Sequence, residues 1–204
     1  MKRILCYGDS NTWGYNAVNG ERYPENIRWT GILRKRLHAD VLEEGLCGRT
    51  GATEDSTYPH LNGLRPLPML LSALKPIDAA VMMLGTNDCK TCYHPDAADI
   101  TAGIGKCVDE LLKVLPAEKI LLVSPLCLEP CVVTADEDFD IGSVEISKQL
   151  PALYAELAAS KGVHFMATGD HARACPVDGE HLDENGHAAF AEAVCSALSE
   201  YGMV

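Results

Sequence analysis

Short apolar runs alternate along the chain with segments in which apolar residues recur every three or four positions. Five runs are continuous and are predicted to be strands: residues 4–7, 40–43, 79–83, 119–123 and 163–166. A strand that is apolar on both faces is typical of a parallel sheet covered by helices on each side. The pattern therefore predicts a parallel sheet buried in the middle of the molecule.

Helical spacing connects these runs. Three predicted helices have an apolar face, carried by Trp29, Ile32, Leu33 and Leu37 in the first, by Ile100, Ile104, Val108, Leu111, Leu112 and Leu115 in the second, and by Phe190, Val194, Leu198 and Tyr201 in the last. A further helix over 144–160 contains Pro151, which predicts a kink or a restart there. Strands interleaved with helices imply βαβ units with right-handed crossovers. We predict one α/β domain over 1–204, a three-layer α/β/α sandwich with a five-stranded parallel sheet.

Two longer segments, 53–68 and 125–142, lack either periodicity and are predicted to be loops. Both follow predicted strands, and loops at the carboxyl ends of parallel strands build the sites of such folds. The acidic run Asp136-Glu137-Asp138 in the second segment is interpreted as a solvated surface rather than a ligand.

Charge and cysteine content narrow the function classes. Acidic residues outnumber basic ones by 29 to 17, which argues against a nucleic-acid or anionic-membrane partner. No run approaches the ~20 apolar residues of a membrane span, and the first apolar run is too short for a signal peptide. Nine cysteines, an odd number, favour reduced thiols and a cytoplasmic protein. Cys89 and Cys92 form one CxxC, which lacks the second clean pair of a structural zinc site, so we expect no metal.

Polar residues follow the predicted strands at four places: Ser10 after the first, Gly48 after the second, Asn87 after the third, and Asp178 with His181 after the last. Because the carboxyl ends of parallel strands meet at one edge, these residues are expected to converge. A serine nucleophile needs a general base within hydrogen-bond reach. The Asp-x-x-His spacing offers that base and a carboxylate to orient it.

The other two positions suit the stabilisation of an oxyanion. Gly48 has no side chain, so its N–H can approach a substrate closely, and Asn87 can donate through its amide. Each residue alone also has a structural interpretation, as a turn, loop or cap residue. Asp183 is the rival of Asp178, because it can either orient His181 or cap the last helix.

Together these residues match a known family. GDSNTWG, the Gly48 turn, GTND and DGEH resemble, in order, the four sequence blocks of the SGNH hydrolases, also called the GDSL esterase/lipase family. RWTG, VLEEGLCGRT, LNG and MMLGTNDCK are similar to its bacterial arylesterase/acyltransferase subgroup. The resemblance implies a flavodoxin-like sheet, with Ser10 as nucleophile and Asp178 and His181 as acid and base. It also implies an oxyanion hole of the Ser10 N–H, the Gly48 N–H and the Asn87 side chain.

The chain departs from the family pattern at three positions. Asn11 replaces the leucine of the family's nickname, Glu43 stands where many relatives carry Asn, and Gly48 stands where the subgroup often carries Ala. Asn11 and Trp13 are predicted to contact the substrate at the rim of the site. Asp9 is interpreted as a structural residue that ties down its loop.

The prediction is a serine esterase that hydrolyses small acetyl or aryl esters through an acyl-enzyme on Ser10, with acyl transfer to alcohols as a further reaction. The resemblance implies no cofactor, a small-molecule substrate and a homo-oligomer. A carbohydrate O-acetyl esterase with the same residues is the alternative within the enzyme class, and Trp13, Tyr15 and Trp29 are aromatic candidates for either substrate. A non-catalytic binding protein that retains the fold is the alternative from another class.

Overall fold

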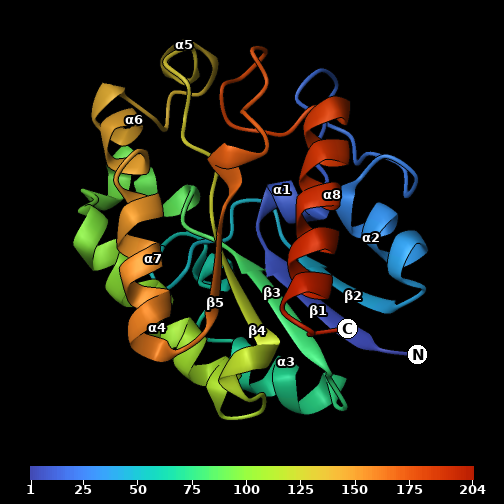
Figure 1. Ribbon diagram of the computed structural model, residues 1–204. Helices are drawn as coiled ribbons and strands as arrows, with labels where there is room; N and C mark the ends of the chain where they lie inside the picture. Colours follow the sequence, from blue (N-terminus) through green and yellow to red (C-terminus); the bar gives the residue numbers. More distant parts are fainter.

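A five-stranded parallel sheet forms the centre of the computed structural model, which describes residues 1–204. The strand order is β2-β1-β3-β4-β5, and every neighbouring pair is parallel (Figure 1). The strands are β1 (Arg3–Gly8), β2 (Asp40–Gly45), β3 (Ala79–Met83), β4 (Ile120–Ser124) and β5 (His164–Ala167). All five predicted strands are confirmed, with shifts of one or two residues at their ends.

Helices cover both faces of this sheet, as Figure 1 shows. The α-helices are α1 (Ser10–Trp13), α2 (Trp29–Leu37), α3 (Leu67–Leu74), α4 (Ala97–Leu112), α5 (Val132–Ala135), α6 (Ile141–Ser147), α7 (Leu150–Lys161) and α8 (Glu184–Glu200). Short 3₁₀ helices are η1 (Pro59–Leu61), η2 (Asn87–Cys89), η3 (Thr91–Tyr93), η4 (Ala117–Lys119) and η5 (Thr168–Asp170).

The core has one apolar cluster on each face of the sheet. Successive residues of a strand point to opposite faces, so Leu5 and Tyr7 of β1 join α3, α4 and α7, whereas Ile4 and Cys6 join α2 and α8. Trp29 is buried and packs edge-on against Phe190, with ring centroids 5.1 Å apart, which joins α2 to α8. The predicted three-layer α/β fold is confirmed.

The helix predictions are correct in part. The restart at Pro151 is confirmed, because α6 ends at Ser147 and α7 begins at Leu150. The predicted loops are not wholly irregular: the first contains η1 and the start of α3, and the second contains α5 and the start of α6. Helix α3 has only eight residues, too few to show a clear periodicity in the sequence.

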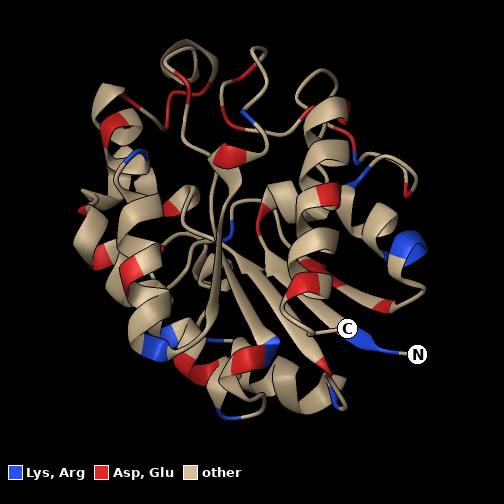
Figure 2. Cartoon of the chain, in the orientation of Figure 1, with Lys and Arg blue, Asp and Glu red and all other residues tan.

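The segments that leave the carboxyl ends of the strands gather at one edge of the sheet, at the top of Figure 1. Acidic residues lie on several of these segments, as Figure 2 shows. No helix in the structure is long and apolar enough to cross a membrane.

Candidate active site

Ser10 lies where the chain turns sharply from β1 into helix α1. An added Cβ on Gly8 would lie 2.1 Å from Thr12 Oγ1, so the turn requires a glycine there. Asp9 caps α1, because its Oδ1 accepts a hydrogen bond of 3.0 Å from the Asn11 N–H. Burial raises the pKa of Asp9 to about 6. Ser10 is only 4% exposed, and it is held by the helix start rather than by a flexible loop.

His181 reaches Ser10 from the other end of the chain. Its Nε2 lies 2.8 Å from Ser10 Oγ, and its Nδ1 lies 2.6 Å from Asp178 Oδ2. Asp183, the rival carboxylate, instead caps helix α8 by accepting a hydrogen bond from the Gly186 N–H at 2.7 Å. The structure therefore brings together Ser10, His181 and Asp178 in the geometry of a nucleophile, a base and its orienting carboxylate.

The Asp178 carboxylate also organises the backbone of its own loop. Its Oδ1 accepts hydrogen bonds from the N–H groups of Glu180 and His181, at 3.0 and 3.1 Å. Burial alone would raise the pKa of Asp178, but the hydrogen bonds and charge of His181 outweigh it and lower the pKa to about 2. The pKa of His181 is raised, because its hydrogen bond to Asp178 and the charge of Glu180 outweigh the effect of burial.

The predicted oxyanion donors lie on neighbouring loops that are tied together. Gly48 has a φ of +81°, a left-handed conformation that favours glycine, and its N–H donates no hydrogen bond within the protein. The Asn87 side chain donates from Nδ2 to the Arg49 carbonyl at 3.1 Å, which links the loop after β3 to the loop after β2. The Arg49 guanidinium in turn donates to the Gly8 carbonyl at 2.9 Å, so Arg49 connects the segments that follow β1, β2 and β3.

Asn11 is placed differently from its prediction. It is 2% exposed, and both ends of its amide bond the loop that carries His181: Nδ2 donates to the Glu180 carbonyl at 3.3 Å, and Oδ1 accepts from the Leu182 N–H at 2.9 Å. These contacts use the side chain to hold the two halves of the site together. The geometry gives Asn11 a positioning role in place of the predicted rim contact.

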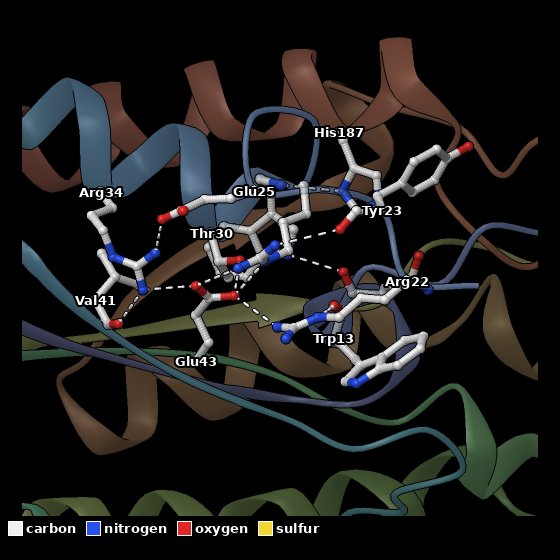
Figure 3. A network of polar contacts seen from close by, with 12 residues as sticks. Trp13, Arg22, Tyr23, Glu25, Thr30, Arg34, Val41, Glu43 and His187 are labelled. Atoms are coloured by element: carbon white, nitrogen blue, oxygen red, sulfur yellow. Dashed lines mark hydrogen bonds and ion pairs between the residues drawn. The ribbon is translucent and has the colours of Figure 1, made fainter.

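Trp13, the other predicted substrate contact, is half-buried beside a network centred on Glu43 (Figure 3). The Arg22 guanidinium donates to the Trp13 carbonyl at 2.6 Å and to Glu43 at 2.8 Å, and it lies 5.6 Å above the Trp13 ring. An isolated antiparallel bridge pairs Tyr15 with Arg22. The network therefore anchors the end of α1, which carries Trp13, and the loop after it, which carries Tyr15.

Two further residues lie against His181: Tyr15, predicted only as an aromatic candidate for the substrate, and Glu180, which has no predicted role from the sequence. The Tyr15 ring lies over the His181 imidazole, with centroids 4.4 Å apart and planes inclined by 40°. The Glu180 carboxylate lies 3.8 Å from His181 Nδ1. Tyr15 could be found in the sequence only as a nearby aromatic residue, whereas Glu180 lies visibly between Asp178 and His181.

The comparisons with known proteins agree with this geometry. A model of the GDSL-like lipase/acylhydrolase family matches residues 6–189. The chain belongs to this family. GDSL-family membership makes the protein a carboxylic ester hydrolase.

Solved structures of two bacterial esterases are similar over nearly the whole chain. The carbohydrate acetylesterase Est24 from Sinorhizobium meliloti is 36% identical, with a TM-score of 0.92 over 98% of this chain and 99% of that one. The native aryl esterase of M. smegmatis is 34% identical, with a TM-score of 0.92 over 98% of this chain and 100% of that one. No curated protein matches the sequence.

Proposed function

We propose that the protein is a serine esterase in which Ser10 is the nucleophile, His181 the general base and Asp178 the residue that orients it. The observation that carries the proposal is the continuous chain of contacts from Asp178 Oδ2 to His181 Nδ1 and from His181 Nε2 to Ser10 Oγ, at 2.6 and 2.8 Å. In this arrangement the imidazole accepts the serine proton while Asp178 stabilises the resulting positive charge.

The reaction proceeds in two steps. Ser10 Oγ attacks the ester carbonyl, His181 takes the hydroxyl proton, and the oxyanion accepts hydrogen bonds from the N–H groups of Ser10 and Gly48 and from Asn87. His181 then gives the proton to the departing alcohol, which leaves an acyl group on Ser10. Water, or a second alcohol, attacks the acyl-enzyme with His181 again as base, so hydrolysis and acyl transfer share one intermediate.

The substrates are small esters with an acetyl or short acyl group. Ser10 and His181 are 4% and 7% exposed, which favours a confined acyl site. The likeness to an aryl esterase supports aryl esters, and the likeness to Est24, a carbohydrate acetylesterase, supports acetylated sugars as the second candidate. Rates on phenyl acetate, longer-chain aryl esters and acetylated xylosides separate the two.

We further propose a cytoplasmic homo-oligomer. All nine cysteines are free, which suits a reducing compartment. The oligomer rests on the resemblance to the arylesterase subgroup alone. Light scattering of the purified protein tests it, and a monomer at micromolar concentration would contradict it.

The decisive test of the proposed function replaces Ser10. Ser10→Ala is expected to lower kcat on phenyl acetate by at least about 10⁴-fold, because the nucleophile and base act as a unit. A fluorophosphonate probe should label the wild-type protein stoichiometrically and leave the variant unlabelled. Ser56→Ala, in an exposed loop, is the control and should retain full activity. Full activity in Ser10→Ala would overturn the assignment, and a folded wild-type protein that takes no label would favour the non-catalytic binding protein.

A further inference from the structure

Glu180 presents an unusual carboxylate to the site. The residue is 5% exposed, yet its carboxylate oxygens accept no hydrogen bond within the protein, and their ion-pair partner is His181 Nδ1 at 3.8 Å. A carboxylate that is largely buried and accepts no hydrogen bond from the protein is disfavoured in its ionised form, so the fold gains little stability from it. Its one charged neighbour within 4 Å is the imidazole of His181, the proposed base.

Hydrogen bonds fix the main chain of Glu180 beside His181. The Glu180 N–H donates to Asp178 Oδ1 at 3.0 Å, and its carbonyl accepts from the Asn11 side chain at 3.3 Å. The backbone of Glu180 therefore cannot move away from His181 without breaking the contacts that also position Asp178 and Leu182.

The Nδ1–H of His181 has one hydrogen-bond acceptor, Asp178 Oδ2, which lies at 2.6 Å. Glu180 at 3.8 Å is too distant for a hydrogen bond but close enough for a strong charge interaction in a buried site. We propose that Glu180 is a positioning residue that supplies a second negative charge to His181 and so favours its protonated form during acyl transfer. The proposal rests on the function proposed above, in which His181 is the base.

Other charged groups surround this pair and set the background against which Glu180 acts. The titratable groups whose charge acts on Glu180, or on which Glu180 acts, are Asp178 on its own loop, Asp9 after β1, Asp136 after α5, Lys90 after η2, and the thiols of Cys47 and Cys89. Three of these groups are carboxylates, and burial together with their charge raises the pKa of Glu180 to about 7. Glu180 is consequently ionised at mildly alkaline pH, where a serine esterase with a histidine base is active.

The charge of Glu180 makes two opposite contributions to the rate. It raises the pKa of His181, so a larger fraction of the base is protonated and inactive at low pH. It also stabilises the imidazolium that forms when Ser10 loses its proton, which speeds the reaction once His181 is neutral. Removal of the charge should therefore raise the rate at acidic pH and lower it at alkaline pH, so the pH profile of the variant crosses that of the wild-type enzyme.

The test is the pH dependence of kcat/KM for phenyl acetate in Glu180→Gln. The acidic limb should move down by about one pH unit, and the plateau near pH 8.5 should fall by about threefold to tenfold. Because Glu180 and His181 interact, the wild-type limb reports an apparent pKa of the pair. Glu180→Asp keeps the charge and should restore most of the plateau.

Glu184→Gln is the matched control, since it removes an exposed carboxylate in the first turn of α8, and it should leave the profile unchanged. If Glu180→Gln lowers the rate equally at every pH, or if its limb does not move, the proposal is wrong. If the Gln variant folds poorly, the same pH profile is measured for Glu180→Leu, which also removes the charge. An NMR titration of His181 in Glu180→Gln is independent of turnover. It therefore still tests the charge effect if the wild-type protein proves to have no Ser10-dependent activity, which would defeat the proposed function instead.

Discussion

Two buried glutamates near the carboxyl edge of the sheet have opposite surroundings. The side chain of Glu43, in the second half of β2, is 10% exposed and accepts five hydrogen bonds, from Arg22, Arg28, Thr30 and Arg34 (Figure 3). The side chain of Glu180 is 7% exposed and accepts none. Two side chains with similarly small exposed fractions thus differ in hydrogen bonding: the carboxylate of Glu43 is fully paired, and that of Glu180 accepts no hydrogen bond from the protein.

The pKa values of the two carboxylates differ in the direction that these hydrogen bonds predict. Burial alone would raise the pKa of Glu43, but hydrogen bonds from Arg28, Thr30 and Arg34 lower it to about 2, whereas the pKa of Glu180 is raised to about 7. The network around Glu43 joins β2, α2 and the loop after α1, so it is a structural device. The exposed fraction alone therefore does not predict the pKa of a glutamate; the hydrogen-bond partners of its carboxylate do.

The largest effect in this comparison is expected from Glu43→Gln. Loss of the charge leaves three arginines facing a neutral group, of which Arg28 is 13% exposed and the other two about a third exposed, so the free energy of unfolding should fall by about 2–4 kcal/mol, somewhat less than for a fully buried pair. Urea denaturation at pH 7.5 measures this loss. The activity of the folded variant should change by less than about tenfold, because Glu43 does not touch Ser10 or His181.

Glu44→Gln is the control for this variant, because it removes the neighbouring charge of β2 and its side chain makes no hydrogen bond. If Glu43→Gln lowers the free energy of unfolding by less than about 1 kcal/mol, the network contributes no more to stability than an exposed ion pair does. That result would remove the contrast between the two glutamates.

The Asn87 amide can be compared with the two carboxylates, because it has one partner within the protein and one free donor. Asn87 uses one Nδ2 hydrogen on the Arg49 carbonyl, so the second stays available to an oxyanion. Loss of one oxyanion donor should lower kcat by about 10²–10³-fold, with a small change in KM. Steady-state kinetics on phenyl acetate measure both. Asn185→Ala on the exposed surface of α8 is the control, and a rate loss within threefold in Asn87→Ala would exclude Asn87 from the oxyanion hole.

Topology and the convergence of the site residues could be predicted from the sequence for a physical reason. Strands buried on both faces leave continuous apolar runs, and their carboxyl ends meet at one edge, which brought Ser10, Asn87 and His181 together in the prediction. Asp178 and Asp183 could not be separated, since both lie within three residues of His181 and only the loop geometry assigns one to the imidazole and the other to the helix cap.

Other features depend on tertiary contacts that no local pattern records. Asn11 was predicted at the rim because it replaces an apolar residue, but its partners, at Glu180 and Leu182, are about 170 positions away in the chain. The Glu43 network likewise combines a strand residue with arginines from a loop and a helix. A charged residue gives no sequence signal of whether it will find such partners, which is why Glu180 had no predicted role.

The smallest effect is expected on stability at the site itself. The pKa of Glu180 in the folded protein, about 7, is above the ordinary value of 4.5, so the folded state disfavours its ionised form. This cost is absent below about pH 4.5, grows as the pH rises and is complete above about pH 7. Glu180→Gln should therefore be more stable than wild type by about 1–3 kcal/mol at pH 8 and equally stable at pH 4.

Thermal and urea unfolding at the two pH values measure this difference, with Glu184→Gln as the control for a carboxylate in solvent. An equal stability difference at pH 4 and pH 8 would mean that Glu180 is not held in an unfavourable ionised state. A gain confined to pH 8, together with a lower plateau in kcat/KM, would show that one carboxylate reduces stability and increases the rate. Glu43→Gln should show the reverse pattern, because a fully paired carboxylate stabilises the fold and leaves the chemistry unchanged.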